Sequence, residues 1–388
     1  MDSLKLLALS TALFIVVGYF FSRLTKRNDI ADTLWGMGFL WLSLVTLNFS
    51  PDAIFHFKSK IVLVMVSLWA LRLSLHIGLR TMKKSEDIRY LNWRKGWGKR
   101  EPFFSFFKVF ALQGVILLLI SWPLHVVFLS PVSEVCWTDF LGASLFIFGF
   151  LFETVADAQL TAFKAQKEKK SLILQEGLWS LCRHPNYFGE TLIWWGFFFL
   201  AVGSAEGNLF FILSPLLITF LLIKVSGIAM LEPLLAKKGE EFARYVKRTP
   251  AFLPFKKEDF FIFVKTVIVL VALDYLWLGL FMKDFYVEQT HQVARINGGE
   301  FDVVLWGAVM VYFFIPLSII LYGTRKASSR WDALFRGGVL GLTMYAIYEF
   351  TNIALVKNWP LSMALVDLCW GSILCGLTSF LTFTEKKQ

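Results

Sequence analysis

The stretch Gly177-Leu-Trp-Ser-Leu-Cys-Arg-His-Pro-Asn-Tyr-Phe-Gly-Glu190 joins a polar, basic loop to an apolar segment. Pro185 suits the first position of a helix, because its φ is fixed and its missing N–H would be unpaired there. Arg183, Tyr187 and Glu190 stand at i, i+4 and i+7, so a helical turn would place them on one face. A helix N-terminus beside an arginine favours a phosphate or carboxylate. The stretch therefore predicts a site for a charged ligand, and the alternative is a loop whose basic side chains only anchor at lipid headgroups.

The composition outside this stretch is that of an integral membrane protein. Of 388 residues, 56% are hydrophobic and only 18% are charged, whereas soluble domains have about a quarter of their residues charged. The net charge of +10 does not predict nucleic-acid binding, because the cations lie in loops between apolar runs. The 4 cysteines and 5 histidines show no metal-ligand spacing, so we expect neither disulfides nor a metal site.

About eleven apolar runs are long enough, or nearly so, to span a bilayer at roughly twenty residues each. They cover residues 4–21, 34–49, 61–77, 109–129, 140–156, 191–202, 209–225, 260–282, 303–322, 337–356 and 361–383. The first run lacks a basic start and a small-residue cleavage site, so we interpret it as a retained helix and not a signal peptide. We expect an all-α membrane fold.

Charge in the loops predicts the orientation of these helices. Cations cluster in every second loop, after the first, third, fifth and seventh runs; among them are Arg23, Lys26, Arg27, Arg80, Lys84, Arg94, Lys164, Lys237, Lys238, Arg244 and Lys247. The positive-inside rule then places the N-terminus outside and the C-terminus in the cytoplasm. A short polar segment at residues 256–259 divides the chain into a seven-helix domain, residues 1–257, and a four-helix domain, residues 258–388.

Ionisable side chains gather at the predicted cytoplasmic ends of the first seven helices. Glu153 and Asp157 stand at i, i+4, and two like charges near a membrane boundary cost free energy unless cations or donors offset them. Simpler interpretations exist for the rest of this set, as helix caps or as side chains that reach the headgroups; its members are Asp32, Arg72, His76 and Lys164. Together they predict a cytoplasm-facing pocket for a phosphate-bearing cofactor, with a hydrophobic substrate that enters from the bilayer.

Two segments resemble a known superfamily. The run Trp179-x-x-x-Arg183-His-Pro-Asn-Tyr-Phe-Gly-Glu190 and the tail Tyr245-Val-Lys-Arg248-Thr-Pro250 are similar to the signature of the membrane steroid 5-alpha-reductases and sterol reductases. The resemblance covers roughly residues 1–255 and is closest to an uncharacterised bacterial branch. It implies a seven-helix domain in the bacterial inner membrane. The implied activity is hydride transfer from NADPH to a carbon–carbon double bond of an isoprenoid, sterol-like or unsaturated acyl lipid.

The resemblance also implies roles for individual residues. Asn186 and Glu190 correspond to contacts with the cofactor amide. Further implied cofactor contacts are Glu153, Asp157, Lys164, Arg183, His184, Tyr245 and Arg248. Tyr187, Asp32 and Glu190 are the candidates for catalysis, because a tyrosine or carboxylic acid must supply a proton. Trp69 stands where steroid reductases have a substrate-binding tyrosine, which argues against a 3-oxo-steroid substrate.

Two other functions remain open. Isoprenylcysteine carboxyl methyltransferases, which bind S-adenosylmethionine, share the Arg-His-Pro-x-Tyr-x-Gly element but normally carry an acidic pair in the tail, where this chain has Glu232 alone. Asn186 and Glu190 favour the reductases. A transporter or lipid-binding scaffold is the third possibility, although the two halves show no internal repeat of the kind that many transporters have.

The second half, residues 260–385 approximately, resembles an uncharacterised bacterial family of four-helix membrane proteins. The resemblance rests on Asp274-Tyr-Leu-Trp277, Tyr345-Ala-Ile-Tyr348-Glu349-Phe-Thr-Asn352 and Asp367-Leu-Cys-Trp370. We expect Asp274, Glu349, Asn352 and Asp367 to face one another in the bundle. They form either a polar brace between helices or a second lipid-modifying site.

Overall fold

A computed structural model describes residues 2–82, 84–130, 135–166, 172–204, 209–255, 257–297 and 300–385. The chain divides into two compact units, Met1–Pro254 and Phe255–Gln388, called unit 1 and unit 2 below. Regular structure in the described residues is helical except for one antiparallel ribbon, formed by β1 (Ile296–Asn297) and β2 (Glu300–Phe301). The predicted all-α membrane fold is confirmed.

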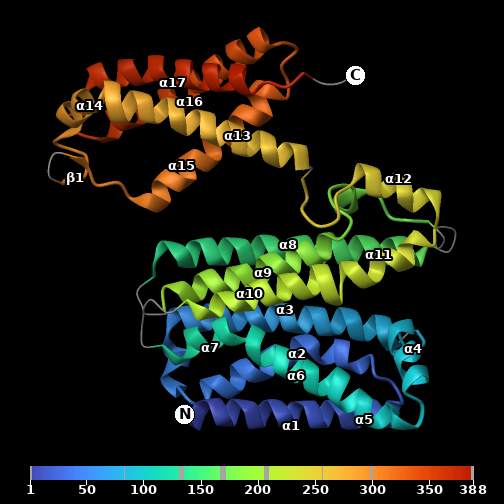
Figure 1. Cartoon of the computed structure of the whole chain (residues 1–388). Helices are drawn as coiled ribbons and strands as arrows, with labels where there is room; N and C mark the ends of the chain where they lie inside the picture. The colour runs from blue at the N-terminus through green and yellow to red at the C-terminus, as the bar shows by residue number, and fades with distance from the viewer. Residues whose placement is uncertain are drawn as a thin grey trace. The chain divides into compact units, whose positions relative to one another are not determined.

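Unit 1 consists of long helices that run lengthwise beside one another, with short helices at their ends (Figure 1). The helices are α1 (Asp2–Thr25), α2 (Ile30–Leu47), α3 (Phe57–Met82), α4 (Ile88–Trp97), α5 (Glu101–Ser105), α6 (Leu112–Ile120), α7 (Trp122–Leu129), α8 (Trp137–Ala165), α9 (Pro185–Val202), α10 (Leu213–Phe220), α11 (Ile228–Ala236) and α12 (Glu240–Arg248). Single 3₁₀ turns cover Pro51–Phe55, Gly98–Arg100, Gly177–Ser180 and Phe210–Ile212, and π-helical segments cover Phe106–Ala111 and Leu221–Val225.

Unit 2 is built from four long helices and one short one. They are α13 (Lys257–Asp274), α14 (Lys283–Thr290), α15 (Leu305–Ser318), α16 (Arg330–Leu355) and α17 (Leu361–Thr382). Helices α13 and α15 continue into π-helical segments, Tyr275–Phe281 and Ile319–Thr324. Leu270, Ile319 and Leu374 are buried together at the centre of this unit.

Nine helical segments within the described residues are long and apolar enough to cross a membrane. Two of the predicted spans do not reach that hydropathy, because α9 carries Asn186 and Glu190 and α16 carries Asp332 and Glu349. Both are nevertheless helical, and each packs along an apolar neighbour, α9 on α8 and α16 on α17. The described residues thus contain nine candidate spans where about eleven were predicted, and the other two predicted runs, α9 and α16, are helical.

The fourth span differs from its predicted bounds of 109–129. Helical backbone already begins at Ile88 and runs through α4, α5 and α6 to Ile120, which together form one candidate span. The helix is interrupted at Ser121, and α7 starts at Trp122 with Pro123 in its first turn. The interruption is expected, because a proline cannot continue a preceding helix. The basic residues from Arg89 to Arg100 therefore lie on helical turns and not in a loop.

Aromatic rings at the core of unit 1 fix the helices that carry the polar residues. Trp69 of α3 and Trp194 of α9 are fully buried, and their ring centroids lie 5.5 Å apart in an edge-to-face arrangement. Phe39 of α2 packs 4.5 Å from the Trp194 ring. Such pairs contribute about 0.5–1.5 kcal/mol each beyond the area they bury, so α2, α3 and α9 are held in fixed register.

Glycines bring α8 and α9 into backbone contact. A Cβ on Gly149 would lie 2.6 Å from the Gly189 carbonyl oxygen, and a Cβ on Gly189 would lie 2.7 Å from the Glu153 amide nitrogen. Small residues at such positions let membrane helices approach closely. This contact holds the Glu153 turn of α8 against the start of α9.

Candidate functional site

A network of ion pairs closes one end of unit 1, where α1 ends and α4 and α5 lie (Figure 1). We call this the basic end. Arg23 of α1 lies 2.7 Å from buried Glu101 of α5, and the Asn28 side-chain amide donates to Ser105 Oγ at 2.8 Å. The backbone N–H of Asn28 donates to Glu86 at 2.5 Å. These contacts tie the α1–α2 turn to α4 and α5, and they form the frame of the site.

The centre of the site is Arg72, which reaches from α3 to two carboxylates on α8. Its Nη1 lies 2.9 Å from Asp157 Oδ2, and its Nη2 forms an ion pair with Glu153. Asp157 Oδ1 also accepts a hydrogen bond of 3.3 Å from the Asn186 side chain on α9, and His76 Nε2 lies 3.9 Å from Asp157 Oδ2. These five residues, here called the Arg72 cluster, bring α3, α8 and α9 together.

Arg72 resolves the repulsion expected between Glu153 and Asp157. The two carboxylates are only 2% and 7% exposed, and a buried charge without a partner is costly. The pairing is incomplete, however: within the described residues, Arg72 Nε and Glu153 Oε2 have no hydrogen-bond partner, and neither does Thr191 Oγ1 on α9. Unsatisfied donors and acceptors of this kind are what a polar ligand could use.

A cavity of about 420 Å³ adjoins this cluster between α3 and α8. Its polar walls are Arg72, His76, Thr154, Asp157 and Thr161. Cations surround this end of α8: Lys164 is exposed, and the charges of Arg80, Lys84 and Lys238 act on it. The cavity therefore lies next to the buried Arg72 cluster and near several exposed, positively charged side chains.

A second group of predicted residues meets at the starts of α2, α4 and α9. Asp32 accepts hydrogen bonds from the Tyr90 hydroxyl at 2.6 Å and from Arg89 at 3.0 Å. The charges of Glu190 and Asp32 both act on Tyr187, and Glu190 is 8% exposed. The three catalytic candidates, Asp32, Tyr187 and Glu190, thus share one electrostatic neighbourhood.

A third group of predicted residues contacts the C-terminal segment of unit 1. It consists of Arg183, His184 and Tyr245. Arg183 Nε donates to Glu232 at 2.8 Å, and its backbone N–H donates to the Pro250 carbonyl. The Tyr245 hydroxyl donates to the Trp179 carbonyl at 2.5 Å. The side chains of Arg183 and Tyr245 are therefore bonded to protein groups, and the backbone N–H of His184 donates to the Ala251 carbonyl. These bonds anchor the segment that follows α11.

The side chain of His184 is buried at the start of α9. It precedes Pro185, which is the first residue of α9 as predicted, and its ring stacks on Tyr187 with centroids 5.6 Å apart. Burial lowers the pKa of His184 to about 4, against a smaller opposing effect of Glu232. The ring is therefore neutral at physiological pH. The last predicted contact, Arg248, is exposed.

Sequence reasoning included Arg72 in the predicted pocket without identifying its partners, and it gave Tyr90 no role in catalysis. Arg72 had a visible signal, because it is a cation inside an apolar run and stands one turn from His76. Its partners lie 81 and 85 positions away on α8, and such distant pairing is not encoded in local periodicity. Tyr90 lies outside the apolar runs, and its partner Asp32 is 58 positions away.

Unit 2 has a polar cluster of its own, here called the carboxyl cluster. Asp274 accepts hydrogen bonds from the Trp370 indole at 3.0 Å and from the Tyr312 hydroxyl at 2.7 Å. Tyr286 donates to Asp367. Glu349 is fully buried and accepts from the Trp359 indole at 2.6 Å, and it also hydrogen-bonds Asp367. Three of the four residues expected to converge, Asp274, Glu349 and Asp367, are thus held by aromatic donors.

Comparisons with known proteins agree with a membrane protein and give no activity. The model of a family described as "Protein of unknown function (DUF1295)" matches residues 18–249, and that of one described as "Predicted membrane protein (DUF2177)" matches residues 260–384. An uncharacterized protein of Schizosaccharomyces pombe is 25% identical over 211 residues, which is 48% of this chain and 60% of that relative. The chain thus matches less than two thirds of the relative's length. No solved structure matches significantly.

Proposed function

This chain belongs to the family described as protein of unknown function (DUF1295), and for it we propose that unit 1 binds NADPH and reduces a carbon–carbon double bond of a hydrophobic lipid. The observation that carries the proposal is the Arg72 cluster beside a cavity of about 420 Å³. Asn186 belongs to that cluster, and Glu190 lies within reach of its charges. The proposal extends to the setting: the bacterial inner membrane, with the basic end in the cytoplasm.

The residues present fit a dinucleotide in two respects. Unpartnered buried atoms of Arg72, Glu153 and Thr191 offer hydrogen bonds to a polar ring or amide, and the cations near Lys164 suit phosphate groups. NADPH, when bound, supplies the hydride that adds to the electrophilic carbon of the double bond. Arg72, Asp157 and Asn186 would hold the cofactor, and the cations around Lys164 would hold its phosphates.

A proton must then reach the other carbon of the former double bond. Tyr187, Asp32 and Glu190 remain our candidates for this role, and the structure adds Tyr90, whose hydroxyl donates to Asp32. The Tyr90 hydroxyl shares its proton with Asp32, so the two side chains form a pair that could pass a proton to the lipid. The product is the saturated lipid, with one hydrogen from the cofactor and one from this relay.

A binding titration tests the proposal. The full chain in lipid nanodiscs should bind NADPH saturably, and Asn186→Ala and Glu190→Ala should each weaken binding at least tenfold. Arg248→Ala is the matched control: this exposed residue should leave the dissociation constant within twofold of wild type. Binding of S-adenosylmethionine in place of NADPH would establish the methyltransferase alternative, and binding of neither would favour a non-catalytic scaffold.

A further inference from the structure

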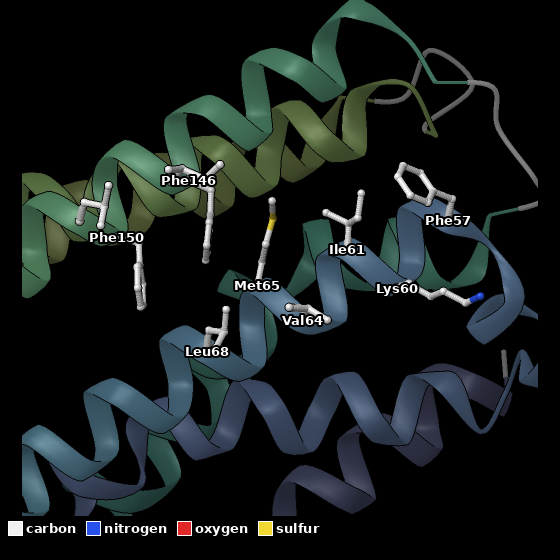
Figure 2. A pocket seen from close by; sticks show the side chains of 10 residues that line it. Phe57, Lys60, Ile61, Val64, Met65, Leu68, Phe146 and Phe150 are labelled. Atoms are coloured by element: carbon white, nitrogen blue, oxygen red, sulfur yellow. The ribbon is translucent and has the colours of Figure 1, made fainter.

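An apolar groove lies between helices α3 and α8 (Figure 2). The groove has a volume of about 450 Å³, and its walls are the turns of α3 from Phe57 to Leu68 and of α8 from Phe146 to Leu151. Figure 2 shows Met65 of α3 projecting into the space that faces Phe146 of α8. Among the described residues that line it, Lys60 alone is charged, so the groove suits a hydrocarbon.

The groove and the polar cavity meet at one contact. Phe150 lines the groove, and the guanidinium carbon of Arg72, which lines the cavity, lies 5.9 Å from the centre of the Phe150 ring. Fifteen residues of α3 separate Phe57 from Arg72, which at 1.5 Å per residue is about 22 Å. One extended ligand could therefore lie along α3 with an apolar part in the groove and a polar end at Arg72.

The surroundings of the groove identify the kind of occupant. Val64, Leu68 and Leu151 are 57%, 54% and 56% exposed, and they lie within the candidate membrane spans Phe57–Met82 and Trp137–Ala165. In a bilayer these side chains face acyl chains and not water. A lipid can thus enter sideways without crossing a polar surface, whereas a soluble peptide or nucleotide would have to leave water to reach it.

We propose that the α3–α8 groove holds the hydrocarbon chain of the lipid substrate and directs its conjugated carbonyl end to Arg72 and His76. This inference rests on the proposed function and deepens it, because it names the class of substrate: a long-chain lipid whose double bond lies next to a carbonyl at the polar end. Arg72 and His76 carry N–H groups that can donate hydrogen bonds to a carbonyl oxygen. Polarisation of that carbonyl makes the adjacent double bond electrophilic.

Photocrosslinking in native membranes tests the groove. A benzophenone amino acid at position 68, in the groove, should capture a carbonyl-bearing long-chain lipid, identified by mass spectrometry of the digested adduct. The matched control is position 75 of the same helix, where Leu75 is 62% exposed and is not among the groove residues. Equal capture of the same bilayer phospholipids at both positions would overturn the inference.

A groove-filling variant separates this inference from the proposed function. Val64→Trp should reduce lipid capture at position 68 at least fivefold and leave NADPH affinity within twofold, whereas Leu75→Trp should change neither. If Val64→Trp binds NADPH and captures the lipid as wild type does, the groove is not the substrate channel. If the wild-type protein captures a specific lipid at position 68 but does not bind NADPH, the proposed function fails and the groove remains a lipid site.

Discussion

The Arg72 cluster of unit 1 and the carboxyl cluster of unit 2 both place acidic side chains inside a helical membrane domain, but they compensate them differently. Glu153 and Asp157 both pair with one guanidinium, that of Arg72. Asp274, Glu349 and Asp367 are held by tyrosine and tryptophan donors, and no Lys, Arg or His in the described part of unit 2 pairs with them.

This difference indicates which interactions stabilise each cluster. A hydrogen bond between two carboxyl groups requires a proton on one of them, so the contact of Glu349 with Asp367 lowers the net charge of the carboxyl cluster. The Arg72 cluster instead contains a permanent positive charge that pairs with both of its acids. Unit 1 should therefore be sensitive to the loss of a single charge, and unit 2 should tolerate neutral substitutions.

The largest expected effect is that of Arg72→Met. Removal of one partner of a buried ion pair leaves uncompensated charge and costs about 3–5 kcal/mol, so this variant should unfold far more readily in detergent or nanodiscs. Arg80→Met, on the exposed turn of the same helix, should change stability by less than about 0.5 kcal/mol.

The triple variant Arg72→Met, Glu153→Gln, Asp157→Asn checks the cause of that loss. It removes the stranded charges together with the arginine, so it should regain most of the stability that the single variant loses. A triple variant as unstable as Arg72→Met would mean that packing, and not charge balance, explains the effect.

An intermediate effect is expected from pH, through neutral His184. Its pKa is about 4 in the folded protein and about 6.5 when unfolded, so protons bind preferentially to the unfolded state. Stability is complete above pH 6.5 and falls as pH drops toward 4, and linkage gives a loss of about 2 kcal/mol between pH 7 and pH 5. Thermal melts of wild type and His184→Phe isolate this contribution, and the account is wrong if both lose the same stability.

The smallest effect is expected in unit 2. Glu349→Gln keeps the shape of the side chain and can still donate to Asp367, so its cost should stay below about 1 kcal/mol. Glu349→Ala, which leaves the Trp359 indole without its acceptor, should cost more, about 1–3 kcal/mol. If Glu349→Gln destabilises as strongly as Glu349→Ala, the residue is ionised, and the proposed contrast between the units is lost.

Hydropathy and local sequence signals predicted most of the helices, but not the contacts between residues that are distant in the sequence. Hydropathy placed the helices, and the fixed φ of Pro185 marked the start of α9. The partners of Arg72 on α8 and the bond of Arg183 to Glu232, 49 positions away, depend on tertiary packing. The motif around Arg183 predicts a ligand contact, and it gave no sign of the ion pair with Glu232.

Some residues of α8 and α9 that were predicted to share a site do lie together in the Arg72 cluster. Glu153, Asp157 and Asn186 were predicted together and lie together, because the α8–α9 glycine contact brings their two helices into register. The start of the fourth span was predicted too late in the chain, because the charged residues around Arg94 resemble a loop in hydropathy. They form a helix whose Arg94 pairs with Glu86.

The most direct measurement of the central claim is isotope transfer. Membranes that contain the full chain are incubated with NADPH carrying deuterium at the nicotinamide C4 position, and their lipids are analysed by mass spectrometry. The account predicts one deuterium on carbon in a saturated lipid with the wild-type protein, and none with Asn186→Ala. Absence of deuterium from the lipids, together with methyl transfer from labelled S-adenosylmethionine, would contradict it.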